Sequence, residues 1–388
     1  MTQNYVKELV GEVFNDIADA IEKGSFDKKI KVGLTTLGSE HGVSELVKAA
    51  IMAQDKYPDF EVVLIGPKVE GDFEQYDAAT PEEGHKIMEK LLDDGIIDSA
   101  VTMHYNFPIG VSTVGRAVTP GTGREMTIAT TTGTSSTLRV EGMFKNAIYG
   151  IITAKAMGQK NPSLGILNVD GARQVERALK ELSAGGYNIN FAGSVREEGG
   201  CIMRGNDLLS GAPDIMVTDS LTGNLLIKIL SSFTTGGSYE ALGYGYGPGV
   251  GEGYKRIICI ISRASGAPLI RDALKYAADA AKNNLIGITE KEFLSAKKAG
   301  YNDILQRLAA PLVNKEAIDN IKMPPKRVAT YSIAGVDILE LEDAVKELWK
   351  AGIYSESGMG CTGPIILVND DDGEKAKGVL IKSKYLAK

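Results

Sequence analysis

Short runs rich in β-branched residues alternate with amphipathic helical segments, and this alternation is the feature that most limits the fold. Eight runs have the character of strands: KIKVGLTT, FEVVLIG, SAVTMHY, MTIATTT, SLGILNV, NINFAGSV, DIMVTDS and RIICIIS. Between them lie segments with helical spacing of apolar residues, such as VSELVKAAIMAQDKY and HKIMEKLLDDG. Strands buried on both faces read as continuous apolar runs. The pattern therefore predicts an α/β fold with three αβα layers and a mostly parallel sheet.

Composition narrows the possible partners. The 388 residues carry a formal charge of −7 and no cluster of Lys and Arg, so nucleic acid is not expected as a partner. No apolar run approaches the roughly 20 residues that a membrane span needs, and acidic residues interrupt the first apolar segment, which excludes a signal peptide. We expect a cytoplasmic protein. The three cysteines are far apart and form no CxxC pair, so neither a disulfide framework nor a metal site is expected, and no cofactor is indicated.

Polar or glycine-bearing loops follow several predicted strands. Ligands of parallel α/β sheets bind beyond the carboxyl ends of the strands, which makes these loops the place for a site. In DSLTGNLLIKIL, Gly223 and Asn224 fall near the start of a helix, where unpaired N–H groups favour an anion, and Lys228 follows one turn later. In SRASGAP, Arg263 emerges where a strand ends and could clamp phosphate. The alternative for the loop of Gly223 and Asn224 is an ordinary strand-to-helix turn, and the alternative for Arg263 is a surface salt bridge.

The segment from 236 to 253 has eight glycines in eighteen positions. No GxGxxG in it follows a strand and opens a helix, so it is not a dinucleotide fingerprint. It is typical of a mobile lid or of a loop that lies close to a ligand, and a plain flexible loop is the alternative.

The most unusual cysteine lies near the C-terminus, in ESGMGCTGPIILV. Cys361 precedes an apolar run instead of lying within it, and the neighbouring glycines leave room for backbone N–H groups to turn toward the sulfur. A thiolate stabilised in this way would be a nucleophile, whereas an inert loop cysteine is the alternative. Cys201, in EEGGCIMRG, is the rival thiol.

Three stretches resemble known acyltransferases. GNDLLSGAPDIMVTDSLTGNLLIKIL, with the segments before it, resembles the phosphate acyltransferases of phospholipid synthesis, and VTMHYNFPIG resembles a loop that carries an asparagine in that family, here Asn106. GYGPGVGEGYKRIICIISRASG resembles the phosphate acetyltransferases, in which a Ser-Arg pair acts at the active site, here Ser262 and Arg263. The resemblance implies phosphate-binding roles for Asn106, Asp219, Gly223, Asn224 and Lys228. The acidic residue that phosphate acetyltransferases carry after this pair is out of register here, at Asp272.

GMGCTGP resembles the alpha subunit of component C of the glycine, sarcosine and betaine reductase complexes. That resemblance implies that Cys361 is the acetyl-carrying nucleophile and that an acetyl thioester reacts with inorganic phosphate to give acetyl phosphate. It also implies a component C beta subunit, a selenoprotein as acyl donor, and an oligomeric assembly.

We expect two lobes, as in isocitrate dehydrogenase and the phosphate acyltransferases, plus a C-terminal extension. The first lobe spans 1–155 and 255–285, the second spans 156–254, and the extension with Cys361 spans 286–388. Three alternatives remain open. The chain could be a free-standing phosphate acyltransferase that uses coenzyme A or carrier-protein thioesters, a non-catalytic scaffold for the beta subunit, or a dinucleotide oxidoreductase.

Overall fold

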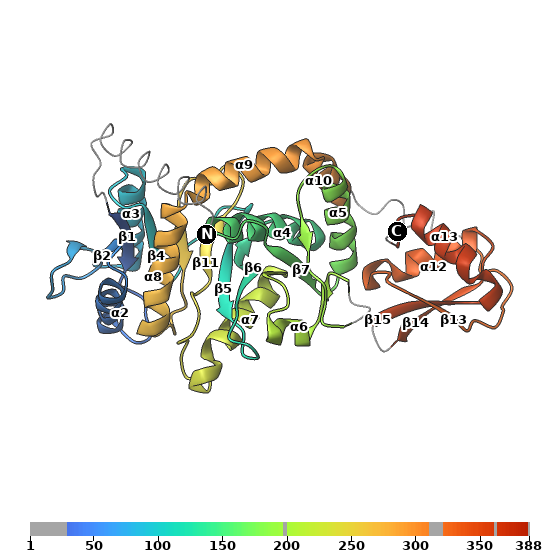
Figure 1. Ribbon diagram of the computed structural model, residues 1–388, viewed down its shortest axis with the longest axis horizontal. Coiled ribbons are helices and arrows are strands. Elements are labelled where there is room, and N and C mark those ends of the chain that lie inside the picture. The colour runs from blue at the N-terminus through green and yellow to red at the C-terminus, as the bar shows by residue number, and fades with distance from the viewer. Residues whose placement is uncertain (1–28, 197–199, 310–320, 361–362, 387–388) are drawn as a thin grey trace, which may run out of the picture.

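The computed structural model describes residues 29–196, 200–309, 321–360 and 363–386 and has an α/β architecture (Figure 1). The strands of its larger sheet are β1 (Ile30–Thr35), β2 (Phe60–Ile65), β3 (Glu74–Tyr76), β4 (Ser99–Thr102), β5 (Val111–Val118), β6 (Glu125–Thr134), β7 (Ser163–Leu167), β8 (Asn190–Phe191), β9 (Ile202–Met203), β10 (Ile215–Val217), β11 (Gly247–Val250) and β12 (Ile258–Ile260). The helices around it are α2 (Val43–Lys56), α3 (Pro81–Asp93), α4 (Arg139–Ala156), α5 (Ala172–Ala184), α6 (Gly205–Ser210), α7 (Ser220–Ser232), α8 (Ala267–Lys282), α9 (Leu285–Lys298) and α10 (Tyr301–Ala309).

The larger sheet has the order β3-β2-β1-β4-β12-β11-β5-β6-β10-β7-β8, with β9 also paired to β7. Strands β1, β2, β3, β4 and β12 form one parallel group, and β6 to β10 form another. Between them, β11 is antiparallel to both β12 and β5, and β5 is antiparallel to β6. The two parallel groups therefore point in opposite directions. The predicted α/β class with a mostly parallel sheet is confirmed.

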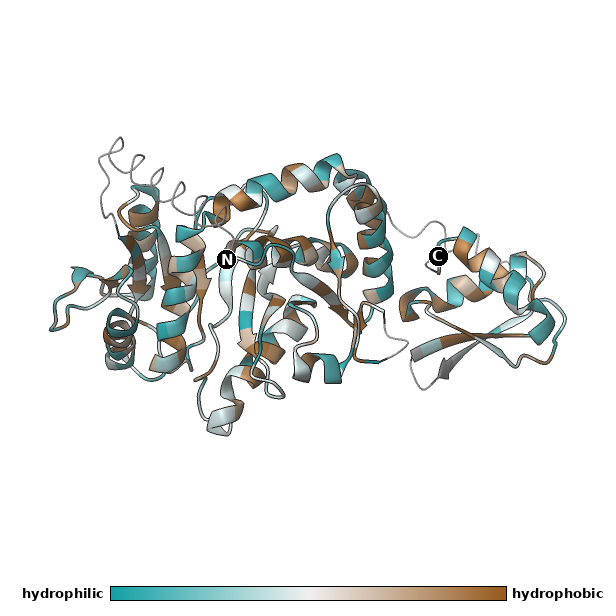
Figure 2. Ribbon diagram, viewed as in Figure 1, coloured by the Kyte–Doolittle hydropathy of each residue, from teal (hydrophilic) through white to brown (hydrophobic). Residues whose placement is uncertain are grey.

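Helices cover both faces of this sheet because alternate strand residues point to opposite faces. On β2, Val62 and Leu64 join a core with α2 and α8, whereas Val63 and Ile65 join a core with α3. In the other group, α4 and α5 share a core on one face, and α6 and α7 contribute to the core on the opposite face. Figure 2 shows the resulting pattern, with apolar residues along the inner strands and polar residues on the outer sides of the helices.

The glycine-rich segment contains a central strand. All four residues of β11 are buried, and β11 is paired on both sides. At Gly247 φ is 80°, and a Cβ atom there would lie 1.7 Å from the carbonyl oxygen of Val114. At Gly249 a Cβ atom would lie 2.4 Å from the ring of Phe107. Glycine allows these close backbone approaches, so the prediction of a mobile lid is wrong for the β11 part of the segment.

Gly247→Ala is expected to destabilise the protein by about 3 kcal/mol or more, because it adds both a steric overlap and strain at positive φ. Urea denaturation followed by circular dichroism measures this change. Gly205→Ala is the matched control, since a Cβ atom at Gly205 meets nothing within 4 Å. Equal midpoints for the two variants would contradict the close packing described for β11.

Residues 321–386 form a separate small core beside α5 (Figure 1). Its elements are β13 (Tyr331–Ala334), α12 (Leu341–Lys350), β14 (Ser355–Gly360), β15 (Gly363–Val368) and α13 (Gly373–Lys382). We call these residues the C-terminal unit. The sequence around its acidic turn, PIILVNDDDGEKAKGVLIKS, predicts strand, turn and strand, but the segment after the turn is the helix α13.

Polar contacts hold the C-terminal unit against α5. The carboxylate of Asp337 accepts hydrogen bonds from the backbone N–H groups of Gly171 and Arg173, both at 3.2 Å, at the start of α5. Arg177, further along α5, forms an ion pair with Glu340. Helices α9 and α10, which the predicted extension includes, instead pack against α4. The lobe boundaries at 155, 254 and 285 stay predictions.

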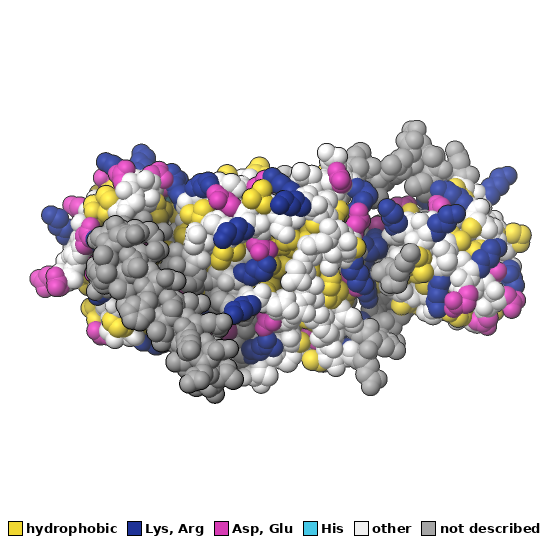
Figure 3. Space-filling model, turned by 45° about the horizontal axis from the view of Figure 1, so that its top comes forward, with side chains coloured by type: hydrophobic (Ala, Val, Ile, Leu, Met, Phe, Trp, Pro, Cys, Tyr) yellow, Lys and Arg dark blue, Asp and Glu magenta, His cyan; other side chains and the backbone are white. Residues whose placement is uncertain are grey.

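The surface carries both signs of charge. On the face in Figure 3, Lys and Arg side chains are interspersed with Asp and Glu side chains, in keeping with the modest formal charge of −7. Within the described part of the chain, every helix is too short or too polar to span a bilayer.

Candidate functional site

A pocket of ≈ 510 Å³ lies where strands of the two parallel groups end. Its walls come from the segments that follow β4 and β12, from the last residues of β6, and from α7. Five of the predicted site residues line it: Asn106, Asn224, Lys228, Ser262 and Arg263. These residues are far apart in sequence, so the fold has brought them together. The location agrees with the rule that ligands of α/β sheets bind beyond the carboxyl ends of strands.

The turn after β12 fixes Ser262 and Arg263. The backbone N–H of Ser262 donates to Ser265 Oγ at 3.0 Å, and Ser262 Oγ accepts from the N–H of Ala264 at 3.1 Å. Arg263 Nε donates to the carbonyl of Gly38 at 3.1 Å, which ties the side chain to the loop after β1. The terminal guanidinium nitrogens have no acceptor among the described residues, and they are available to an anion in the pocket.

Helix α7 presents Asn224 and Lys228 to the pocket from one face, because they are four residues apart. Asn224 Nδ2 donates to the carbonyl of Thr131 at 3.0 Å, which holds its side chain against β6. Lys228 Nζ lies 3.8 Å from Glu240 Oε1, and the lysine side chain is half exposed. The pocket therefore has two cationic groups, Lys228 and Arg263, on different walls.

Asp219 and Gly223 position α7 and do not line the pocket. Asp219 is the N-cap: its carboxylate accepts from the backbone N–H of Thr222 at 3.0 Å and from Thr222 Oγ1 at 2.7 Å. Burial alone would raise the pKa of Asp219, but the hydrogen bonds from Thr222 and the charge of Arg139 outweigh burial and lower that pKa.

The N–H of Gly223 is not free for an anion, because it donates to the carbonyl of Asp219 at 2.9 Å. The expectation of an unpaired amide at Gly223 is therefore wrong. A Cβ atom at this position would lie 1.8 Å from the carbonyl oxygen of Thr130, so glycine lets α7 approach β6 closely.

Sequence reasoning missed Glu240 and Tyr246. Glu240 is only 2 % exposed, and its Oε1 accepts from the hydroxyl of Tyr246 at 3.3 Å. No described residue donates to Glu240 Oε2, which is buried. Tyr246 lines the pocket, and burial, followed by the charge and hydrogen bond of Glu240, raises its pKa well above the usual range. Both residues lie in the glycine-rich segment, where a buried carboxylate has no local sequence signal.

Two of the three cysteines have the surroundings of inert thiols. Cys201 is 4 % exposed, and burial beside Glu176 raises the pKa of its thiol to about 12. Cys259, in β12, is 1 % exposed, and burial raises its pKa further. Cys201 lies in a turn directly before β9, as the sequence predicts, but its side chain packs in a hydrophobic core, which makes it a poor rival thiol. Cys361 lies outside the described residues, and the strands on either side of it, β14 and β15, are paired.

Of the other titratable candidates, Asp272 and His85 lie outside the pocket and His104 lines it. Asp272 lies on α8, where it pairs with Arg271 and accepts a hydrogen bond from Tyr57 at 2.9 Å, so it does not reach the pocket. His104 lines the pocket. His85, which the sequence places in solvent, is half buried with Nε2 3.1 Å from Thr102 Oγ1, and burial lowers its pKa. The described residues offer no group of three His, Cys, Asp or Glu side chains that could hold a metal ion.

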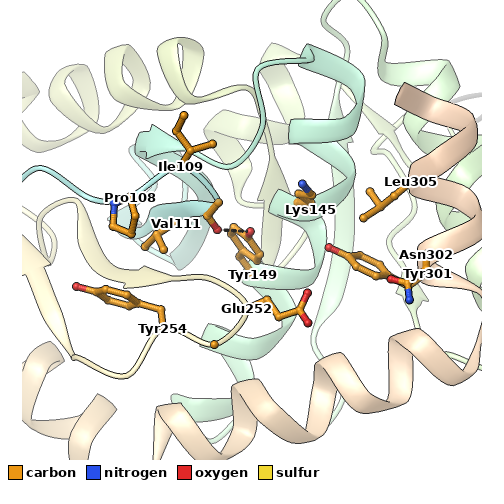
Figure 4. A pocket seen from close by; sticks show the side chains of 12 residues that line it. Pro108, Ile109, Val111, Lys145, Tyr149, Glu252, Tyr254, Tyr301, Asn302 and Leu305 are labelled. Carbon is orange, nitrogen blue, oxygen red and sulfur yellow. Dashed lines mark hydrogen bonds between the residues drawn. The ribbon is translucent and has the colours of Figure 1, made fainter. Parts of the chain in front are cut away.

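A second pocket of ≈ 330 Å³ lies next to the first and contains none of the predicted site residues (Figure 4). Ile109 lines both pockets. Most polar groups that line the second pocket already have partners in the protein. Lys145 is paired with Glu141, Glu252 is paired with Lys297, and Tyr149 donates to the carbonyl of Gly110 at 2.6 Å. The cationic groups that suit phosphate therefore gather in the first pocket.

Comparisons with known proteins identify the family of this chain. Residues 30–367 match a family described as "Fatty acid synthesis protein". The chain is 62% identical over 375 residues to the glycine/sarcosine/betaine reductase complex component C subunit alpha of Peptoclostridium acidaminophilum, covering 97% of each chain. It is 22% identical over 338 residues to a phosphate acyltransferase of Thermotoga petrophila, covering 70% of this chain and 97% of the relative. A branched-chain phosphotransacylase from Enterococcus faecalis covers 64% of this chain and 98% of its own, with 14% identity and a TM-score of 0.42.

Proposed function

This chain belongs to the family of component C alpha subunits of the glycine/sarcosine/betaine reductase complex, and from that membership we propose that it transfers an acetyl group from a thioester on Cys361 to inorganic phosphate. The product is acetyl phosphate. The observation that carries the proposal is the pocket at the strand ends, where Lys228, Arg263 and the amides of Asn106 and Asn224 face one cavity. Two cations and neutral donors are the groups that hold a phosphate dianion.

Transfer of the acetyl group to phosphate requires the protein mainly to position phosphate beside the thioester carbonyl. A phosphate oxygen attacks the thioester carbonyl carbon, a C–O bond forms, the C–S bond breaks, and the sulfur of Cys361 leaves as a thiolate. Phosphate is a weak nucleophile in water, so holding it beside the carbonyl supplies much of the rate. Arg263, which is tethered to Gly38, and Lys228 on α7 fix the anion from two walls.

The carrier cysteine belongs to the C-terminal unit, which contacts α5 through Asp337 and Glu340. Arg177 of α5 also donates to the carbonyl of Tyr385, so the contacts named here are polar, as is usual for interfaces between domains that move relative to one another. We propose that this unit brings the acetylated Cys361 to the pocket. A component C beta subunit, a selenoprotein that supplies the two-carbon unit, an oligomeric assembly and a cytoplasmic location complete the proposal.

A two-step reaction with the purified full-length chain tests the proposal. The chain is first acetylated with an excess of a small radiolabelled acetyl thioester and freed of reagent, and inorganic phosphate is then added. We expect the label to stay on the protein without phosphate and to leave as acetyl phosphate, trapped as its hydroxamate, when phosphate is present. A chain that accepts no label would indicate the scaffold role, and phosphate-independent loss of label would indicate simple hydrolysis; either result would overturn the proposal.

A further inference from the structure

We propose that the exposed apolar side of helix α7 is the interface between two copies of this chain, which meet about a two-fold axis beside their phosphate pockets. The inference goes beyond the proposed acetyl transfer and does not depend on it. It concerns four side chains on α7 and on the 3₁₀ turn η1 (Phe233–Thr235) that continues the helix: Leu221, Leu225, Ile229 and Phe233. We call these four residues the α7 ridge.

The side chains of the α7 ridge are largely uncovered. Leu221 is 71 % exposed, Leu225 is 53 % exposed, Ile229 is 61 % exposed and Phe233 is 44 % exposed. Residues four apart are neighbours on a helix surface, so the four side chains form one continuous strip. Phe233 belongs to the strip because its backbone angles remain helical, with φ −64° and ψ −31°.

The other sides of α7 have different surroundings. The inner side packs against β5 and β6 and buries Ile227 and Leu230. Asn224 and Lys228 face the phosphate pocket, and Lys228 is the only charged residue in the sequence of the helix. A surface helix of a globular protein typically carries charged and polar residues on its outer side. The α7 ridge is apolar instead, which indicates a surface that another protein covers.

The size of the α7 ridge separates it from the single apolar residues found on any protein surface. Among the described helices, α2 and α9 each expose one large apolar side chain, Ile51 and Leu294. With roughly 200 Å² for each fully uncovered side chain of this size, the four ridge residues expose roughly 450 Å². A standard interface buries about 800 Å² on each partner, and interfaces between identical subunits are about 65 % apolar. The ridge therefore supplies most of the apolar area that such an interface needs.

The spacing of the ridge favours a second copy of the chain as the occupant. The commonest class of helix packing fits ridges of side chains four residues apart on one helix between the same kind of ridge on another, at an angle of about −50°. A second α7 carries that ridge, so α7 can pack against its own copy about a two-fold axis. The ridge has no charged side chain, so its partner needs no opposite charge. Transient partners are usually bound through more polar surfaces.

This arrangement places each pocket beside the interface. Leu225 and Ile229 directly follow Asn224 and Lys228 in the chain, and Asn224 and Lys228 line the pocket. In the dimer, the partner covers the outer side of α7 while the pocket side stays open. The two phosphate sites then lie on either side of the axis, and each α7 is held between its own sheet and the partner subunit.

Sedimentation equilibrium of the purified full-length chain tests the inference. We expect the wild type to be a dimer at micromolar concentration. Ile229→Asp should weaken the dimer by at least about 100-fold, because burial of one such side chain contributes about tenfold or more and the two-fold axis counts each substitution twice. Leu294→Asp is the matched control: Leu294 on α9 is also 61 % exposed, and the substitution should leave the dimer intact.

Cross-linking gives an independent measurement without a charged substitution. In a Cys361→Ala background, the remaining native cysteines, Cys201 and Cys259, are buried. A cysteine introduced by Ile229→Cys should react with a short bismaleimide and join two chains. A cysteine introduced by Leu294→Cys should leave the chains single under the same conditions.

Each outcome decides a stated claim. A monomeric wild type would overturn the second copy as the occupant and would leave the ridge to the beta subunit. Equal dimer strength in Ile229→Asp and Leu294→Asp, or equal cross-linking through Ile229→Cys and Leu294→Cys, would overturn the ridge as the interface. Circular dichroism checks that Ile229→Asp is folded, and the cross-linking decides the question where it is not. The acetyl-labelling reaction is a separate measurement, so the proposed transfer is tested independently of the dimer.

Discussion

Iodoacetamide is expected to label Cys361 far faster than Cys201 or Cys259 and to abolish acetyl phosphate formation. The thiolate is the species that reacts, and its fraction near neutral pH falls about tenfold for each unit by which the pKa rises. Burial raises the pKa of Cys201 to about 12, and Cys259 is buried in β12 with a raised pKa as well. Tryptic mass spectrometry after a short exposure measures the labelling of each cysteine.

Cys361→Ala is the matched variant for this experiment, and it should lose acetyl transfer by several orders of magnitude while its thermal unfolding is unchanged. Cys201→Ala should keep the transfer activity. Comparable labelling of all three cysteines with activity intact would remove Cys361 from the mechanism. Full activity of Cys361→Ala with a coenzyme A thioester would instead identify a free-standing phosphate acyltransferase.

Arg263→Gln should raise the KM for phosphate by about 10- to 100-fold, since charge-assisted hydrogen bonds contribute roughly 1.5 to 3 kcal/mol. The guanidinium lines the pocket, and its Nε bond to Gly38 holds it in place before an anion binds. Initial rates at varied phosphate with acetylated protein measure the change. The turnover number at saturating phosphate should fall much less, because glutamine can still occupy the position.

Arg271→Gln is the control for that measurement, because Arg271 pairs with Asp272 on α8 and does not line the pocket. It should leave the phosphate dependence unchanged. If Arg263→Gln shows the same KM as Arg271→Gln, then Arg263 does not contact phosphate, and Lys228 would have to carry the site.

Apolar runs in the sequence predicted most of the strands. The elements that were missed lack a long apolar run with a clear period. The strands at 30–35, 60–65 and 215–217 coincide with apolar runs. β5 was missed because its sequence, VSTVGRAV, mixes polar residues with small ones, although it lies in the middle of the sheet. β11 was missed because its glycines reflect close approach to neighbouring backbone, which is a property of tertiary packing. The apolar run in α13 is too short for its period to be read.

The site residues likewise divide into those that the local sequence could predict and those whose role depends on tertiary packing. Ser262, Arg263, Asn224 and Lys228 could be named because each follows a recognisable strand and matches a family motif. Asp219 and Gly223 belong to the same motif, but they cap and seat α7 instead of lining the pocket. Chemical type alone could not separate residues that meet a ligand from residues that hold the helix in position.

The amino-acid sequence by itself determined the α/β class and the family, because hydrophobic period and motif spacing are local properties of the chain. Only the tertiary structure decided which side chains share a cavity and which direction their hydrogen bonds take. Glu240 illustrates the difference: nothing near it in sequence marks it, yet it is buried beside the turn of Ala264 and Gly266, with Tyr246 and Lys228 as side-chain partners. The energetic consequence of a charge depends on its desolvation and on neighbours distant along the chain, and folding alone supplies both.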